Sequence, residues 1–296
     1  MRVRVSTSMM SEQSVTSMLQ QQTYIAETQE KMALGLRVVR PSDDPPAAVR
    51  ALILKESIEQ NEQFQVNINM AKSRLEQSDG VLGGIVDTLQ RMNDLAIQSL
   101  NAPLTLKERL AIEAEARKII SQITDLANSK TGTGEYLFAG LQSKTEPFTG
   151  RPQTGGYTYH GDDNLRFTPI GQNHTINDND PGSKVFTVKA PLSGPPQTTL
   201  PPDNIMNLMY TFAEHLKNNV PDSYDLANIQ LAIQTVSSVS VTVGSRLSAL
   251  DLQKTLTDKL VVDEKTHLSQ TQDLDYTEAI TQLNVQTVAL QAAQQA

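Results

Sequence analysis

A heptad pattern of apolar residues constrains this chain more than any other feature. Between Pro45 and Asn101, apolar or small side chains recur in alternating steps of three and four residues. A period of 3.5 is typical of a helix that packs on other helices through one narrow seam. The helix should begin after an N-cap at Asp44 and end ahead of Pro103. The seam positions are Phe64, Ile68, Ala71, Leu75, Ser78, Leu82, Ile85, Leu89, Met92 and Ala96.

The length of this helix predicts an extended molecule. At 1.5 Å per residue, roughly 55 residues span about 80 Å, whereas a compact globule of 296 residues would be only about 50 Å across. The composition agrees, because only 4% of the residues are aromatic and none is Trp. We therefore expect a mainly α fold: an elongated rod of long antiparallel helices in a coiled-coil-like bundle, whose thin core is completed against neighbours.

Three further helices are predicted to complete the bundle. Thr105 and Glu108 form a capping box at the start of the second helix. A short apolar pattern from Ile205 to Leu216 predicts another helix, and a long pattern from Leu226 to Leu250 predicts the C-terminal arm. We expect the bundle core at Leu75, Leu82, Ile85, Leu89, Met92, Ile119, Ile123, Ile233, Val236, Val243 and Leu247.

Proline and glycine divide the chain. Residues 141–205 hold 9 of the 14 prolines and 7 of the 15 glycines, which predicts an inserted β-rich domain that folds separately. Short strands are expected at 157–159 and 184–189. The expected boundaries are an N-terminal assembly and export segment (1–40), a bundle half ending in a β-hairpin (41–140), the insert (141–205), a second bundle half (206–270) and a C-terminal assembly segment (271–296).

Both ends of the chain carry weaker stripes. The first is Val15, Met18, Gln22, Ile25, Gln29 and Met32, and the second is Tyr276, Ile280, Leu283, Thr287 and Leu290. Each stripe alone buries too little to offset the entropy of ordering the segment. We therefore expect these ends to order only against neighbouring subunits. The expected assembly residues are Val15, Met18, Ile25, Met32, Tyr276, Ile280, Leu283 and Leu290.

Charge and composition exclude several classes of function. The net charge of −8 argues against nucleic acid, which needs a basic face. The absence of cysteine excludes disulfides and thiolate chemistry. No run of consecutive apolar residues approaches the roughly 18 of a membrane span, and no cleavable signal is visible at the N-terminus. We therefore expect neither a nucleic-acid nor a membrane partner.

No catalytic, metal or cofactor site emerges from the motifs. The four histidines, His160, His174, His215 and His267, have no ligand spacing, and we interpret them as surface residues. The segment from Asp178 to Gly182 resembles a calcium loop only faintly, and a polar turn is the better interpretation. No nucleophile or phosphate-binding motif is present. The sequence predicts no enzyme activity and no cofactor.

Several stretches nevertheless resemble one known family. Residues 35–45, 89–101 and 243–251 resemble conserved stretches of flagellins and their relatives, and they cover both helical arms in the right order. Gly134–Gly140, followed by Pro147 and Phe148, is similar to the hook-associated protein 3 branch of that family. The stretches at 275–280 and 290–293 are similar to the same branch. Its members continue past residue 293 with another short apolar helix, so the C-terminal segment is expected to be shortened.

This resemblance implies a structural subunit of the bacterial flagellum. Such a subunit is secreted unfolded through the flagellar type III channel with a cytoplasmic export chaperone. It would form a ring of copies of itself at the hook tip and join hook-associated protein 1 to filament flagellin. Two alternatives stay open: a filament flagellin, and an exported stalk whose insert binds a ligand through Tyr157, Tyr159, His160 and Asp162.

Overall fold

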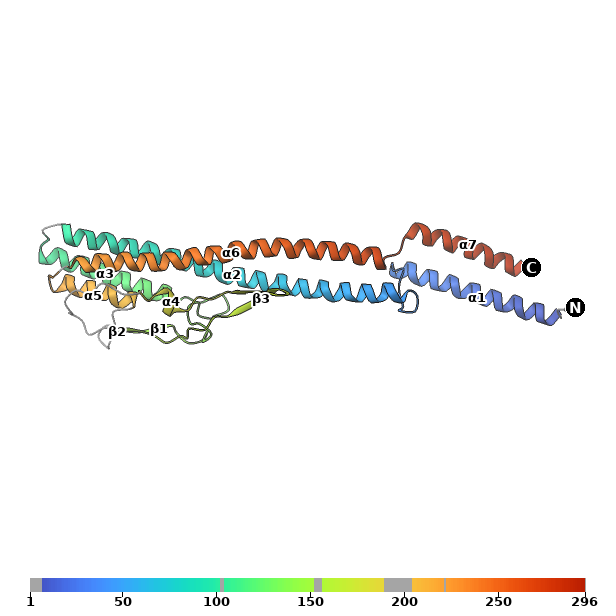
Figure 1. Ribbon diagram of the computed structural model, residues 1–296, viewed down its shortest axis with the longest axis horizontal. Coiled ribbons are helices and arrows are strands. Elements are labelled where there is room, and N and C mark those ends of the chain that lie inside the picture. The colour runs from blue at the N-terminus through green and yellow to red at the C-terminus, as the bar shows by residue number, and fades with distance from the viewer. Residues whose placement is uncertain (1–6, 102–103, 152–155, 189–203, 221, 296) are drawn as a thin grey trace. The chain divides into compact units, whose positions relative to one another are not determined.

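The chain is mainly helical, with two small β-hairpins (Figure 1). The computed structural model describes residues 7–101, 104–151, 156–188, 204–220 and 222–295. The helices are α1 (Thr7–Leu34), α2 (Pro45–Asn101), α3 (Leu106–Ala127), α4 (Gly182–Val185), α5 (Ile205–Lys217), α6 (Ser223–Gln272) and α7 (Tyr276–Gln295). The strands are β1 (Phe148–Arg151), β2 (Gly156–Tyr159), β3 (Phe167–Gly171) and β4 (His174–Asn177).

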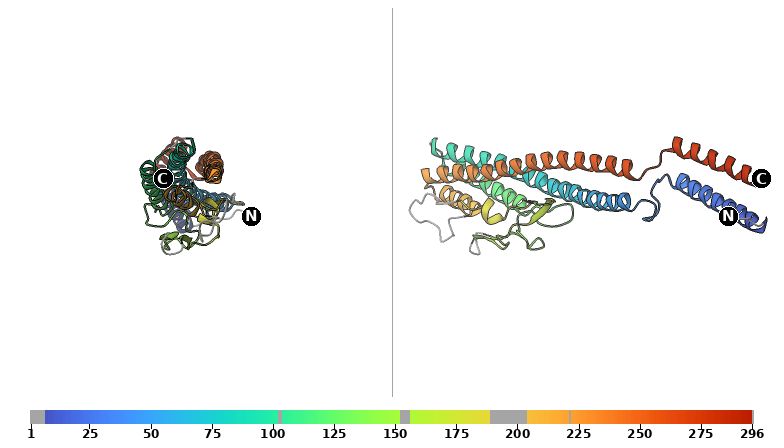
Figure 2. Two further views of the ribbon diagram at one scale, coloured as in Figure 1. Left: turned by 90° about the vertical axis from the view of Figure 1, so that its left-hand side faces the viewer. Right: turned by 45° about the vertical axis from the view of Figure 1, so that its right-hand side comes forward.

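The chain divides into two compact units. Residues 1–63 and 258–296 form the terminal unit, and residues 64–257 form the bundle unit. The long helices α2 and α6 contribute residues to both. Within the bundle unit, α3 packs along α5, and the two hairpins lie on one side of the helices (Figures 1 and 2). In the terminal unit α1 pairs with α7.

The predicted helix starts are confirmed by their caps. The Asp44 carboxylate accepts a hydrogen bond from the Ala47 amide at 3.1 Å, and α2 begins at Pro45. At α3 the Thr105 hydroxyl accepts from the Glu108 amide, while the Glu108 carboxylate accepts from the Thr105 amide at 2.7 Å. Both caps satisfy amides that a helix cannot pair internally, which is why the two helices begin where they do.

The expected seam lies inside the bundle unit. Most of the residues named for the bundle core are buried, and Ile233 and Leu247 are partly buried against the same cluster. The fully buried members include Leu75, Leu82, Ile85, Leu89, Met92, Ile123, Val236 and Val243, and Ile119 is buried as well. One continuous apolar cluster therefore joins α2, α3, α5 and α6.

The insert shares this core. The rings of Phe138 and Phe148 each pack edge-on against Phe186, with centroids 5.4 and 5.0 Å apart. All three rings belong to the apolar cluster that contains the bundle seam. This interleaving argues against the expectation that residues 141–205 fold separately. The domain boundaries themselves stay predictions.

The strand predictions met different outcomes. The strand at 157–159 is confirmed as part of β2, which pairs with β1 in antiparallel register. The strand expected at 184–189 is wrong: residues 182–185 form α4, Thr187 makes only an isolated bridge to Asn204, and Lys189 lies outside the described residues. Tertiary packing accounts for the difference: the Gly182 amide donates to the Phe138 carbonyl, and the consecutive residues Val185 and Phe186 are both buried, whereas a half-buried strand turns neighbouring side chains to opposite faces.

A stretch of α6 has the length and composition of a membrane span. One window of 18 residues has a mean hydropathy of 1.3, although the sequence analysis found no continuous apolar run. Its seam residues Ile229, Val236 and Val243 are buried in the core of the bundle unit. A core helix passes the same test of length and composition, so this window is weak support for membrane insertion.

Truncating the seam tests the core of the bundle unit. Leu89→Ala should lower the free energy of unfolding by about 2–5 kcal/mol, because it leaves a cavity at a fully buried site. The matched change Leu252→Ala removes a side chain that is 64% exposed and should cost less than about 0.5 kcal/mol. Urea unfolding followed by circular dichroism measures both. If both changes lowered the free energy of unfolding by the same amount, the prediction that Leu89 lies in a buried seam would be wrong.

Candidate functional site

One of the four histidines, His215, has a structural role in a buried pair with Asp225. His215 is buried, and its Nδ1 lies 2.7 Å from Asp225 Oδ2, so the interpretation of four surface histidines is wrong at this position. Burial raises the pKa of the Asp225 carboxyl. His160, His174 and His267 are exposed. Among the described residues, no group of three or more His, Asp or Glu side chains is arranged to hold a metal ion.

The segment expected to be a polar turn, Asp178 to Gly182, is buried and paired with arginines. Arg166 binds Asp178 through two hydrogen bonds of 2.8 Å, and Arg246 binds both carboxylate oxygens of Asp180 at 2.7 and 2.9 Å. The carboxylates that could have ligated calcium are therefore neutralised by guanidinium groups. The Arg246–Asp180 pair fastens the insert to α6, and the Arg166–Asp178 pair lies within the insert.

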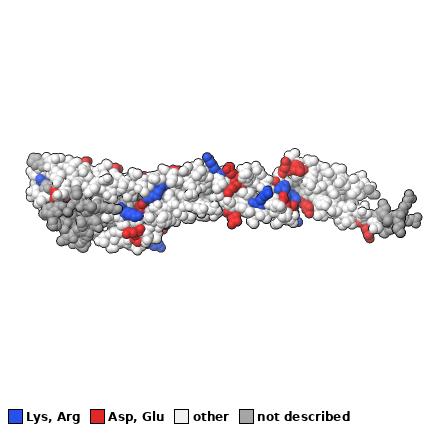
Figure 3. All heavy atoms as spheres, in the orientation of Figure 1, with Lys and Arg blue, Asp and Glu red and all other residues white. Residues whose placement is uncertain are grey.

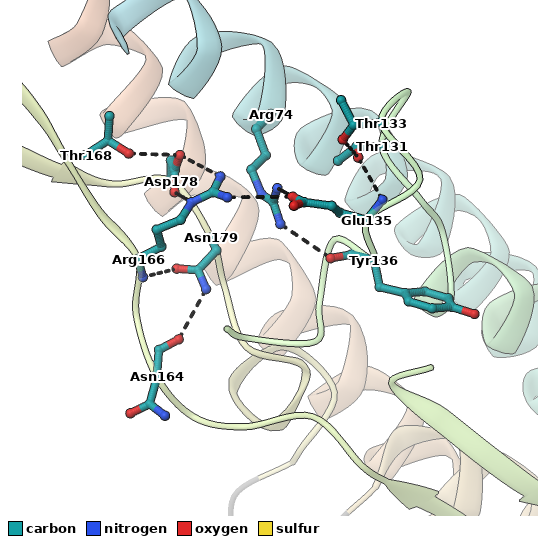
Figure 4. A network of polar contacts seen from close by, with 10 residues as sticks. All are labelled: Arg74, Thr131, Thr133, Glu135, Tyr136, Asn164, Arg166, Thr168, Asp178 and Asn179. Carbon is teal, nitrogen blue, oxygen red and sulfur yellow. Dashed lines mark hydrogen bonds and ion pairs between the residues drawn. The ribbon is translucent and has the colours of Figure 1, made fainter. Parts of the chain in front are cut away.

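A second part of this network reaches α2 (Figure 4). Arg74 on α2 donates to Glu135 at 2.7 Å, and Glu135 also lies 3.7 Å from Arg166. The hydrogen bond from Arg74 lowers the pKa of Glu135, and the bonds to Asp178 raise the pKa of Arg166. The network clamps the loop at 131–136 and the insert onto the bundle helices.

The residues proposed for a ligand-binding insert also hold the fold. The Tyr159 hydroxyl donates toward the carbonyls of Phe138 and Asp162, at 3.0 and 2.9 Å, and burial raises its pKa to about 12. The Asp162 carboxylate accepts from the Leu141 amide at 2.7 Å. These contacts give Tyr159 and Asp162 a structural role within the insert.

In the terminal unit, two connecting segments of the chain are joined to each other by hydrogen bonds. The two connections, residues 35–44 between α1 and α2 and residues 273–275 between α6 and α7, are paired through the backbone. The Arg37 amide donates to the Gln272 carbonyl at 2.8 Å, and the Leu274 amide donates to the Gly35 carbonyl at 3.0 Å. Gly35 has φ +69°, a conformation that favours glycine. We call these segments the paired connections.

Arg37 ties the paired connections to two helix ends. Its guanidinium donates to Asp44, the N-cap of α2, at 3.0 Å and to the Thr271 carbonyl in the last turn of α6 at 2.8 Å. The neighbouring Asp43 accepts from the Arg40 and Val39 amides, and these bonds lower its pKa. The Ala47 amide and Arg37 lower the pKa of Asp44 in the same way. One arginine thus satisfies groups at both helix ends.

Helices α1 and α7 pack antiparallel through a narrow and partly polar seam. The residues expected to mediate assembly divide between two environments. Met18, Ile25, Met32, Leu283 and Leu290 are half-buried in the helix pair, whereas Val15, Tyr276 and Ile280 are exposed. The expected seam positions Gln22 and Gln29 are wrong, because both are exposed and Gln21 and Thr28 occupy the seam instead.

Several apolar side chains are exposed on this helix pair, and long stretches of both helices lack charge. Val285 and Val288 are 65% and 64% exposed, and Leu19 and Tyr24 are exposed on α1. Residues 13–26 and 279–296 contain no charged side chain at all. Figure 3 shows these helices as a nearly uniform white surface. Val285 and Val288 are not among the residues expected to mediate assembly, although the uncharged stretches of the sequence could have indicated them.

Replacing Arg37 tests the paired connections. Arg37→Gln removes donors to both helix ends, so exchange of the Leu274 amide should become roughly tenfold faster, as expected for losing about 1.4 kcal/mol of local stability. Lys259→Gln, which changes an exposed cation on α6, is the control. Mass spectrometry measures the rate of amide hydrogen exchange in both variants. Unchanged exchange in Arg37→Gln would show that Arg37 does not hold the connections.

Comparison with known proteins finds flagellar relatives. The family described as the bacterial flagellin N-terminal helical region matches residues 5–143. Flagellar hook-associated protein 3 of Salmonella typhimurium is 27% identical, covering 98% of this chain and 95% of that protein. The Escherichia coli protein of the same name is 25% identical, covering 99% and 96%. Flagellin FlaB1 of Treponema pallidum is 26% identical but covers only 40% and 41%.

Solved structures share the fold. Flagellar hook-associated protein 3 of Legionella pneumophila aligns with a TM-score of 0.64 at 19% identity, over 74% of this chain and 98% of that one. FlgL of Bacillus cereus aligns with a TM-score of 0.59 at 23% identity, over 73% and 99%. The chain is similar to flagellar hook-associated protein 3 over nearly its full length, and its residues 5–143 match the bacterial flagellin N-terminal helical region.

Proposed function

We propose that this protein is a structural adaptor at the hook–filament junction of the bacterial flagellum. The observation that carries the proposal is the near full-length similarity to two proteins named hook-associated protein 3. The exposed apolar side chains and uncharged stretches of α1 and α7 support it, because the centres of protein interfaces are depleted in charge. The expected partners are further copies of this chain, hook-associated protein 1, flagellin and an export chaperone.

The extent of the similarity favours the adaptor over a filament flagellin. The hook-associated relatives span almost the whole chain, whereas the flagellin FlaB1 of Treponema pallidum spans only 40% of it. The ligand-binding alternative loses support because Tyr159 and Asp162 serve the fold of the insert. The relatives are structural flagellar proteins, so the similarity favours an assembly role for this chain over a catalytic one.

The energetics of the terminal helices support assembly-coupled folding. Within the described parts of α1 and α7, only Thr28 and Ala279 are buried, so the pair gains little from apolar burial. Fixing each residue of the backbone costs about 1–2 kcal/mol. Neighbouring subunits would supply the missing apolar surface on the outward face. Order in these helices is therefore expected to increase on assembly.

Hydrogen exchange on the purified monomer tests this coupling. Amides at 68–96, in the buried seam of α2, should exchange slowly, whereas amides at 15–32 and 279–290 should exchange quickly because little apolar surface protects them. The seam of α2 is the internal control. If the amides at 15–32 were strongly protected from exchange in the monomer, the proposal that these helices order on assembly would be wrong.

A charge on the outward face tests assembly directly. Val288→Asp should leave the melting temperature of the monomer nearly unchanged, because the side chain is 64% exposed. It should abolish filament growth and motility in a strain lacking its own copy of the gene, because a buried unpaired charge is costly in an interface. Electron microscopy of hooks and a swimming assay measure the outcome.

The matched control for this experiment is Val241→Asp. Val241 is 73% exposed on α6 and lies outside the terminal helices. This variant should support filament growth. Normal filaments with Val288→Asp, or equal loss with both variants, would contradict an assembly role for the outward face.

A further inference from the structure

Helix α7 carries two apolar faces, and only one of them packs on α1. The inner face holds Ala279, Leu283, Gln286 and Leu290, which are buried or half-buried. The outer face holds Val285, Val288, Ala289 and Ala292, which are exposed and follow the spacing of an amphipathic stripe. The outer face also includes the exposed Thr281, four residues before Val285, and the inner face includes Gln286. Apolar burial alone therefore gives little reason to choose the inner face.

Hydrogen bonds to Gln286 distinguish the two faces. The Gln21 amide group donates to the main-chain carbonyl of Gln286 at 3.2 Å. The single hydrogen of the Thr28 hydroxyl is shared between two acceptors, the Tyr24 carbonyl on the same helix at 2.8 Å and Oε1 of Gln286 on α7 at 3.0 Å. Thr28 is buried, so its hydroxyl is enclosed by the helix pair. Two α1 residues that are seven positions apart thus converge on one residue of α7.

A rotation of α7 would break this arrangement. Successive residues of a helix are about 100° apart, so turning Val285 toward α1 would carry the Gln286 side chain away from it. Thr28 would then face valine and alanine side chains and keep only the Tyr24 carbonyl as an acceptor, and Oε1 of Gln286 would lose its donor. Buried polar residues in a heptad seam select one pairing in this way, at a cost in stability.

The start of α7 is already held by the paired connections. The Tyr276 hydroxyl donates to the Met32 carbonyl at 3.0 Å, and the Leu274 amide donates to the Gly35 carbonyl. Gln286 lies ten residues further along, or about 15 Å of helix. A single anchor at the start leaves the rest of α7 free to twist or splay. The contact at Gln286 supplies a second anchor.

We propose that the Thr28–Gln286 hydrogen bond, together with Gln21, selects which face of α7 packs on α1. Its consequence is that Val285 and Val288 stay turned outward, available to a neighbouring subunit. The use of that face in assembly rests on the proposed function. The selection itself is a property of the single chain.

Spin labels measure the selection in the full-length monomer. The natural chain has no cysteine, so Gln29→Cys and Asn284→Cys, both at exposed positions, place one label on each helix. Pulsed electron resonance gives the distance distribution between the labels. Thr28→Val keeps the side-chain shape but removes the donor, whereas Thr28→Ser keeps the donor but removes a methyl group. Gln286→Ala removes the acceptor, and Gln291→Ala, at an exposed position of α7, is its control.

In the fraction of monomers whose α1–α7 pair is closed, a single narrow distance is expected for the parent, Thr28→Ser and Gln291→Ala. Thr28→Val and Gln286→Ala should broaden the distribution or add a second distance. In the strain lacking its own gene, Thr28→Val should reduce the number of filaments at least fivefold, and Thr28→Ser should not. A narrow parental distance in Thr28→Val, or equal broadening by Thr28→Ser and Thr28→Val, would overturn face selection.

The proposed function fails in a different way. If Val288→Asp assembles normally while Thr28→Val still broadens the distance, the outward face does not mediate assembly, and the selection of the inner face is supported. If Val288→Asp blocks assembly while Thr28→Val leaves the distance narrow, the assembly role stands and face selection is overturned.

Discussion

The apolar seam of the bundle unit is the constraint on which the other features depend. It runs through α2, α3, α5 and α6 as one continuous cluster, and residues such as Leu82, Leu89 and Val236 are fully buried in it. The insert adds Phe138, Phe148 and Phe186 to this cluster. Because one core serves both the helices and the insert, the small hairpins acquire a fixed place without a large core of their own.

Arginine–carboxylate pairs complete the attachment of the insert. Arg74 and Arg246 extend from α2 and α6, and each binds an acidic side chain of the neighbouring loops. Arg166, on the insert itself, links Asp178 to Glu135. A buried carboxylate without such a partner would be strongly destabilising. These pairs therefore give a region of many turns, prolines and glycines a defined orientation on the helices.

The terminal unit is built on a different balance. Its helix pair has glutamine and threonine in the seam where the bundle unit has leucine and isoleucine, and it leaves valines exposed on the outside. Polar contacts such as Thr28–Gln286 specify a pairing but contribute little stability. Such a pair is well defined when formed and costs little to open. That combination fits the proposed function, in which these ends pack against neighbouring subunits.

The sequence by itself determined the helices of this protein and most of its core. Heptad spacing located Leu75, Leu89 and Val236 on the buried faces, and capping residues located the starts of α2 and α3. Both signals are local, because they follow from the periodicity of a helix and from the unpaired amides at its first turn. The chain's resemblance to flagellins was carried by those same helical arms.

Only the tertiary structure decided where polar residues went. Gln21 and Gln22 are the same residue type, and only the position of Gln286 on the facing helix places Gln21 in the seam. Asp178 and His215 are buried because distant partners, Arg166 and Asp225, satisfy them. Residues 182–185 form a helical turn where the Gly182 amide donates to the distant Phe138 carbonyl and Val185 is buried in the shared core. Each outcome depends on a contact across the fold, which local periodicity cannot report.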